Sequence, residues 1–191
     1  MKTIITISRE FGAGGGEIGD KVAQKLGFEL YDKAIILRTA RESNIGMENI
    51  MKWDEKTPID FGFAQSLFNF YNKPLSEQLF NVQRQVIRQL AEKNNCVIVG
   101  RNANEILRGF ERTLHIFITA DFKWRLERMS KTMPDITANK IKAIDKARSK
   151  NCTHNTDTVF GAAKYYDMSL NTSELGIDTC VDIICELARR A

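Results

Sequence analysis

The chain has 191 residues, of which 43% are hydrophobic and 27% charged, and its formal net charge at pH 7 is +4. A chain of this length can bury roughly 70% of its unfolded surface around one core, and this composition excludes a disordered or fibrous chain. No apolar run approaches the roughly 20 residues that span a bilayer, and Arg9 and Glu10 interrupt the first run before it could form a signal peptide, so we expect one cytoplasmic domain over residues 1–191.

The first elements are a strand, a glycine turn and a helix. Residues 3–8 form a short β-branched run that is typical of a buried strand. The glycine-rich segment 11–19 follows directly. The apolar residues of the next segment recur at helical spacing and stop before Gly27, which can end a helix: Ile18, Val22 and Leu26.

Strands and helices alternate along the rest of the chain. Further strands are expected at 28–31, 96–99, 114–118 and 168–170. Further helices are expected from Asp32, over 75–93, around Trp124 and Met129, over 136–150 and over 177–187. This alternation predicts an α/β protein, a three-layer α/β/α fold with a parallel sheet. Segment 47–73 shows no clean period, and we interpret it as an insert.

The glycine turn has the composition of an anion-binding site. Backbone N–H groups approach phosphate oxygens closely only where no Cβ intervenes, and such turns often need positive φ. The helix that follows adds unpaired N–H groups and a partial positive charge. Five glycines supply these features: Gly12, Gly14, Gly15, Gly16 and Gly19.

Three interpretations of the turn compete. Residues 14–19 fit the dinucleotide pattern G-x-G-x-x-G, and Asp32 lies near the position of the ribose-binding acid of such folds. Residues 12–17 also fit a phosphate-binding P-loop, although the usual lysine and hydroxyl are replaced by Gly15 or Gly16 and by Glu17. The third interpretation is a glycine turn without a ligand.

Arginines elsewhere in the chain favour phosphoryl transfer. An enzyme that joins two phosphorylated substrates must neutralise both, which requires arginines from separate elements. Arg101 follows a predicted buried strand, Arg125 and Arg128 lie one helical turn apart, and Arg148 lies on a polar helix. A dinucleotide-binding enzyme has no such requirement.

Segments over almost the whole chain carry the motifs of one known family: ITISREFGAG (5–14), YDK (31–33), VIVGR (97–101), DKAR (145–148), and YD (166–167) through NT (171–172). In these segments the chain resembles the cytidylate kinase-like family, a branch of the P-loop nucleoside monophosphate kinases. The resemblance implies a P-loop kinase fold and transfer of a phosphoryl group from ATP to a nucleoside monophosphate with Mg²⁺. It implies a small-molecule nucleotide partner, and neither nucleic acid nor membrane.

The resemblance also assigns roles to residues. The donor's phosphates would lie on the loop, whose residues are Gly12, Ala13, Gly14, Gly15, Gly16 and Glu17. Arg101 would contact the acceptor's phosphate. Four residues would belong to a closing lid at about 133–163 and its surroundings: Arg125, Arg128, Asp145 and Arg148. The insert at 47–73 would lie on the acceptor side.

The chain departs from the family pattern at the loop. The branch lacks the P-loop lysine and commonly carries an arginine where this chain has Gly16. A cation near the phosphates would then come from Arg9, Lys21 or the lid. Glu17 replaces the hydroxyl that binds Mg²⁺ and would either coordinate the metal or favour the helix dipole. A non-catalytic nucleotide-binding protein is therefore an open alternative to an active kinase.

The cysteines and histidines do not predict a metal site. Cys96, Cys152, Cys180 and Cys185 form no C-x-x-C pair, so we expect reduced and mostly buried thiols. His115 lies within an apolar run, which favours a hydrogen-bonded core residue. The sequence fixes neither the acceptor base nor the oligomeric state.

Overall fold

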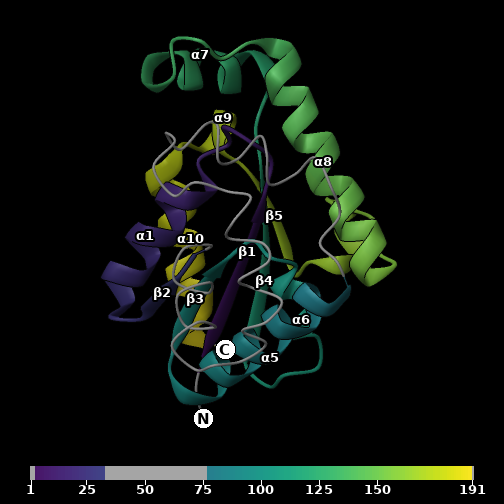
Figure 1. The fold of residues 1–191 in the computed structure, drawn as a ribbon. Coiled ribbons are helices and arrows are strands. Elements are labelled where there is room, and N and C mark those ends of the chain that lie inside the picture. The colour runs from purple at the N-terminus through teal and green to yellow at the C-terminus, as the bar shows by residue number, and fades with distance from the viewer. Residues whose placement is uncertain (1–2, 33–76, 191) are drawn as a thin grey trace.

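A computed structural model of the protein describes residues 3–32 and 77–190 (Figure 1). Five strands form one sheet in the order β2-β3-β1-β4-β5. Their bounds are β1 Ile4–Arg9, β2 Glu29–Tyr31, β3 Cys96–Val99, β4 Thr113–Thr119 and β5 Met168–Asn171. All neighbouring strands pair in parallel. The carboxyl ends of the strands therefore share one edge of the sheet.

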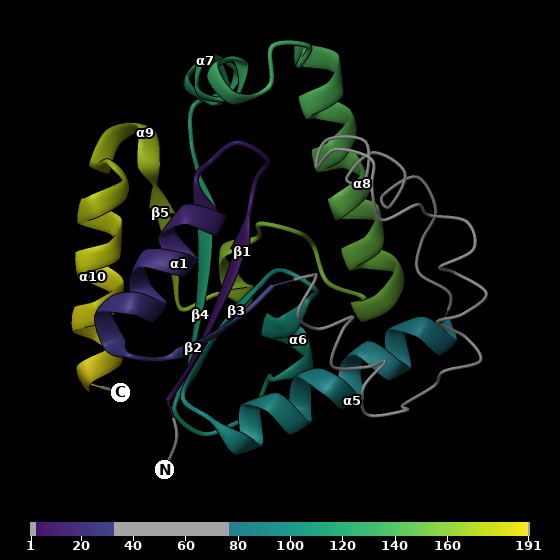
Figure 2. The ribbon, with the colours of Figure 1, turned by 60° about the vertical axis from the view of Figure 1, so that its left-hand side comes forward.

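Helices cover both faces of the sheet (Figures 1 and 2). Helices α1 (Gly15–Leu26) and α10 (Ile177–Arg190) pack on one face, and α5 (Glu77–Lys93) and α6 (Ala103–Ile106) pack on the other. Alternation along β1 produces this division, because Ile5 and Ile7 join the core beneath α1 and α10, whereas Ile4 joins the core beneath α5. The predicted three-layer α/β/α fold with a parallel sheet is confirmed.

Helix α7 (Phe122–Thr132) lies beyond the carboxyl ends of the strands, and α8 (Ala138–Thr156) begins there and runs down beside the sheet (Figure 2). A third apolar cluster joins them to the glycine turn through Phe11, which packs with Met129, Ile141 and Ile144. Phe11 is the residue immediately before the turn. The packing of one aromatic side chain thus fixes both helices against the turn.

Several predicted bounds differ from the observed ones. Helix α8 was expected over 136–150, but it begins at Ala138, because the Thr137 side chain caps it by accepting a hydrogen bond from the backbone N–H of Lys140. It continues to Thr156 and ends where Asp157 adopts a left-handed conformation. Three one-turn elements were not predicted: α6, the 3₁₀ helix η1 (Ala163–Tyr165) and α9 (Thr172–Leu175).

Two predictions concern segments that the structure does not describe. The helix expected from Asp32 and the insert expected at 47–73 lie outside the described residues. Within residues 3–32 and 77–190, no helix combines the length and apolar character needed to cross a membrane.

The cysteines and His115 lie in the surroundings that the sequence predicts for them. All four cysteines are free thiols and buried. The side chains of Thr6 and His115 share a hydrogen bond of 2.8 Å between Oγ1 and Nδ1. His115 is therefore a hydrogen-bonded residue of the sheet, as expected.

Candidate functional site

The turn between β1 and α1 depends on glycine for its shape. Gly12 and Gly14 have φ of 82° and 86°, a region that only glycine adopts readily. A Cβ on Gly12 would lie 2.9 Å from Met129 Cγ, and one on Gly14 would collide with Ile177 Cδ1. Both positions therefore exclude side chains for two reasons, the backbone conformation and the close packing.

The N-terminus of α1 has the features of an anion site. Its N-cap is Gly14, and within the described part of the chain this N-terminus has no side-chain cap. The first-turn N–H groups of such a helix carry the positive end of the helix dipole. Thr172 Oγ1 donates a buried hydrogen bond of 2.8 Å to the carbonyl of Ala13, and this bond holds the turn in place. The geometry suits a phosphate held by backbone amides.

Strand order separates the two ligand interpretations of this turn. A dinucleotide-binding sheet has the order 3-2-1-4-5-6, in which the second strand neighbours the first. Here β3 lies between β2 and β1. The first crossover of the chain therefore skips a strand, and the dinucleotide interpretation is not supported by the topology.

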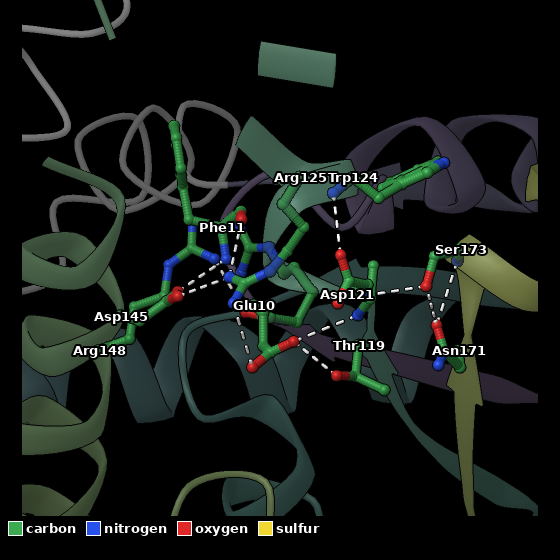
Figure 3. A network of polar contacts seen from close by, with 12 residues as sticks. Glu10, Phe11, Thr119, Asp121, Trp124, Arg125, Asp145, Arg148, Asn171 and Ser173 are labelled. Carbon is green, nitrogen blue, oxygen red and sulfur yellow. Dashed lines mark hydrogen bonds and ion pairs between the residues drawn. The ribbon is translucent and has the colours of Figure 1, made fainter. Parts of the chain in front are cut away.

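Arg125 and Asp145 fasten α7 and α8 to the backbone before the turn (Figure 3). Arg125 Nη1 donates to the carbonyl of Phe11 at 3.1 Å and to Asp145 Oδ2 at 2.6 Å. Asp145 Oδ1 accepts a hydrogen bond of 2.7 Å from the N–H of Phe11. Because Arg125 is only 6% exposed, its guanidinium works as a buried link between the two helices and the turn.

Glu10 extends this network to β4 (Figure 3). Its Oε2 accepts hydrogen bonds from Thr119 Oγ1 at 2.5 Å and from the N–H of Ala120 at 3.2 Å. Its Oε1 lies 3.6 Å from Arg125 Nη2. Glu10 thus ties the ends of β1 and β4 to the start of α7.

Arg148 contacts the same stretch of backbone from α8. Its Nη1 donates a hydrogen bond of 2.8 Å to the carbonyl of Arg9, and its guanidinium lies 5.5 Å from the centre of the Phe11 ring. Arg148 is 8% exposed. Its side chain also reaches a small pocket at the carboxyl edge of β1 and β3.

This pocket gathers predicted site residues from separate elements. Its described lining residues are Ser8, Arg9, Gly100, Arg101, Asn102, Arg148, Asn151 and Phe160. Gly100, Arg101 and Asn102 all have positive φ, at 79°, 62° and 55°. Such a conformation costs about 1–3 kcal/mol for each non-glycine residue and clusters at functional sites. A hydrogen bond of 2.9 Å from Gln83 Nε2 to the Arg101 carbonyl supports it.

Glu17 lies in the first turn of α1 and pairs with two cations. Its Oε1 is 3.0 Å from Lys21 Nζ, and its Oε2 is 2.6 Å from Arg128 Nη2. The hydrogen bond from Lys21, supported by Arg128, holds the pKa of Glu17 below its ordinary value, although burial acts in the opposite direction. For Glu17 to coordinate Mg²⁺, these ion pairs would have to open. Among the residues that the structure describes, no group of three His, Cys, Asp or Glu side chains is placed to hold a metal ion.

The sequence profile of the cytidylate kinase-like family matches residues 4–174, which include the turn, the pocket and both outer helices. The chain belongs to the cytidylate kinase-like family. The match confirms the resemblance inferred from the motifs. No protein of curated function matches the sequence.

Solved structures agree with this family membership. An uncharacterized protein from Eubacterium ventriosum is 25% identical, with a TM-score of 0.75 and 100% of both chains covered. Shikimate kinase from Bacteroides thetaiotaomicron is 16% identical, with a TM-score of 0.57 and 98% of both chains covered. A gluconokinase from Sinorhizobium meliloti is 12% identical, with a TM-score of 0.55, 98% of this chain and 94% of the other. This member of the cytidylate kinase-like family therefore has a P-loop kinase fold.

The structure groups the predicted arginines, Asp145 and Glu17 into three sets. The pocket brings together Arg9, Arg101 and Arg148, whereas Arg125 and Asp145 pair with each other behind the turn. Arg128 pairs with Glu17 across the turn. The roles that the family resemblance assigns to these residues stay predictions.

Sequence reasoning missed several residues that shape the site. Glu10 could have been predicted as a site residue, because it lies inside the motif that precedes the glycines. Thr172 also stands inside a family motif, but its contact with Ala13 joins segments that are distant in the chain. Gln83 and Asn102 carried no comparable signal in the sequence. Asn102 Nδ2 is buried without a hydrogen-bond partner among the described residues.

Proposed function

We propose that the protein is an ATP-dependent kinase that phosphorylates a nucleoside monophosphate. The observation that carries the proposal is the glycine turn, which opens an uncapped helix N-terminus at the same sheet edge as the arginine-lined pocket. The turn suits the donor's phosphates, and the pocket suits the acceptor's phosphate. Membership of the cytidylate kinase-like family and the kinase fold of its structural neighbours support this proposal.

The proposed reaction is a direct phosphoryl transfer. An oxygen of the acceptor's phosphate attacks the γ-phosphorus of ATP, and the bond from that phosphorus to the β,γ-bridging oxygen breaks. The electron pair stays on the bridging oxygen, so the products are ADP and a nucleoside diphosphate. Because a phosphate monoester is largely ionised at neutral pH, the attack requires no general base. Catalysis then rests on positioning and on charge stabilisation.

Each group of residues has a separate task in this proposal. Backbone amides of the turn hold the donor, and Arg101 and Arg148 hold the acceptor phosphate. Mg²⁺ arrives with ATP, because magnesium in kinase sites is held largely by substrate phosphates and water. Arg125 and Asp145 position α7 and α8 over the turn and exclude water from the site. The proposal places no nucleic acid or membrane at this site.

Release of ADP tests the proposal. Purified protein with Mg-ATP and a panel of acceptors, including CMP, dCMP and UMP, is expected to release ADP faster than a control without acceptor. Arg101→Ala is expected to raise the KM for the acceptor while ATP affinity changes little. Arg189→Ala removes an exposed arginine from the end of α10 and is the matched control. No turnover with any acceptor would contradict the proposal.

The ion pairs of Glu17 favour a second candidate, a nucleotide-binding protein without turnover. The loop carries no lysine, and a carboxylate stands in its first helical turn, paired on both oxygens. This candidate predicts saturable binding of ATP or ADP by calorimetry and no product from any acceptor. Calorimetry and the ADP assay together distinguish the two functions.

A further inference from the structure

We infer that Arg9 supplies the cation that a P-loop ordinarily carries as a lysine, at the junction of the donor and acceptor phosphates. The inference rests on the proposed function and identifies a further catalytic residue within it. It depends on where the Arg9 side chain lies, on the residues beside it and on the placement of the other basic residues near the turn.

The Arg9 side chain occupies the space above two glycines. A Cβ on Gly15 would lie 2.7 Å from Arg9 Cβ and 2.8 Å from Arg9 Cγ. A Cβ on Gly100 would collide with Arg9 Nη1. The side chain therefore starts over the glycine turn and ends beside the carboxyl end of β3. Glycine at positions 15 and 100 is explained by this path, because any larger residue would displace Arg9.

This path leads from the donor side of the site to the acceptor side. Gly15 is the first residue of α1, whose N-terminus suits the donor's phosphates. Gly100 precedes Arg101, and both line the same pocket as Arg9 and Arg148. A guanidinium can contact two phosphate oxygens at once, so it suits a position between two phosphates. None of the described residues that line the pocket has a carboxylate.

Strand pairing and a hydrogen bond fix the backbone of Arg9, and this positions the side chain. Arg9 is the last residue of β1 and pairs with Ile118 of β4. Its carbonyl accepts the hydrogen bond from Arg148 Nη1 at 2.8 Å. Catalytic groups placed on strand ends are positioned more accurately than groups on loops.

Three other basic side chains near the turn form ion pairs at other places in the structure. Lys21 lies 3.0 Å from Glu17 and 2.8 Å from Asp178, on the outer side of α1 where it faces α10. Arg128 pairs with Glu17, and Arg125 pairs with Asp145. The sequence offered Arg9, Lys21 or the lid for the missing cation, and of these we favour Arg9, because its side chain runs between Gly15 and Gly100.

Exchange of the cation between two positions tests the inference. Arg9→Ala is expected to lower kcat by roughly 10³-fold, the scale of a lost transition-state arginine. Gly16→Lys alone is expected to fold, because a Cβ at Gly16 would meet no atom within 4 Å. In the double variant, Arg9→Ala with Gly16→Lys, turnover is expected to rise at least tenfold above Arg9→Ala. Lys25→Ala removes an exposed cation of α1 that pairs with Asp182 and is the control.

A binding measurement separates this inference from the proposed function. If the wild-type protein shows no turnover, the proposed function fails, and calorimetry still tests Arg9. Arg9→Ala is expected to weaken ATP binding at least tenfold and to weaken AMP binding by a smaller factor. The inference is overturned if Arg9→Ala retains turnover within threefold of wild type, if ATP and AMP affinities fall equally, or if Lys21→Ala causes the loss instead. Absence of any gain from Gly16→Lys in the Arg9→Ala background would also overturn it, because Arg9 would then act through packing alone.

Discussion

Gly14 and Gly16 are two residues apart, yet the structure excludes a side chain at Gly14 and leaves space for one at Gly16. Gly14 has φ of 86°, and its Cα faces Ile177 of α10. Gly16 lies in the first turn of α1 with ordinary helical backbone, and a Cβ there would meet no atom within 4 Å. The composition of the turn alone does not distinguish these two residues.

Alanine at each of these positions is expected to change stability in opposite directions. Gly14→Ala should lower the free energy of unfolding by about 1–3 kcal/mol through backbone strain. Gly16→Ala should raise it by about 0.5–1 kcal/mol, because it reduces the flexibility of the unfolded chain. Urea denaturation of the two variants measures both changes. Equal destabilisation by both would contradict the description of the turn.

Burial of His115 predicts a dependence of stability on pH. Burial lowers the pKa of His115, although Asp167 acts in the opposite direction. The unfolded chain therefore binds a proton at a higher pH than the folded protein does. Stability should fall as pH drops below the ordinary histidine pKa, with a slope of up to about 1.4 kcal/mol per pH unit. His115→Asn retains a polar atom for Thr6 and should reduce this slope between pH 7 and 5.5, as urea titrations at several pH values would show. An unchanged slope would assign the proton to another group.

At the scale of elements, the Arg125–Asp145 pair joins α7 and α8 to the turn. Each partner also bonds to the backbone of Phe11, so removal of either leaves a charge in a partly enclosed site. Arg125→Met or Asp145→Leu alone should cost about 3–5 kcal/mol of stability. The double variant should cost less than the sum of the two, with a coupling of about 0.5–3 kcal/mol. Additive losses in urea denaturation would mean that the two side chains act independently.

The long elements were predictable and the short ones were not. The spacing of Ile18 and Val22 identified α1, and the strand at 96–99 was predicted with its observed bounds, because both have strong apolar patterns. Helices α6 and α9 have four residues each, too few for a period to be read. The last turns of α8 are polar, so the sequence shows no apolar period there. Cys152 is the buried residue of this part of the helix, and its burial could not be read from the sequence.

The candidate site was predictable only in part for a similar reason. The glycines and Arg101 stand beside predicted strands, so local sequence placed them at the carboxyl edge. The pairing of Arg125 with Asp145, and the path of Arg9 over Gly100, depend on contacts between distant segments. The strand order could not be predicted either. The apolar pattern of β2 does not indicate that β3 lies between β2 and β1.

Chemical labelling of the four buried cysteines can measure global unfolding of the protein. Cys96 of β3 belongs to the apolar cluster beneath α5, and Cys180 and Cys185 of α10 belong to the cluster beneath α1 and α10. Cys152 is buried on α8. Burial raises the pKa of the Cys96 thiol to about 12, and it also raises the pKa values of Cys180 and Cys185. A thiol reagent at pH 8 should label the native protein slowly and all four thiols rapidly in guanidinium chloride. Rapid labelling of the native protein would show that a thiol opens locally.

The shared edge of the parallel sheet is where all the proposed chemistry lies. The turn follows β1, the arginine pocket lies between β1 and β3, and α7 follows β4. In the proposed function, the donor and acceptor phosphates would both bind at this edge of the sheet. The proposed function therefore depends on phosphate binding at the turn more than on any single arginine.

Titration of protein labelled with ¹⁵N-glycine by Mg-ATP tests that claim most directly. The account predicts saturable shifts of the amide signals of Gly14, Gly15 and Gly16, while Gly27 and Gly109, which lie away from the turn, serve as internal references. Gly14→Ala should abolish the shifts of its neighbours. Unchanged signals from the turn at saturating Mg-ATP would contradict the account.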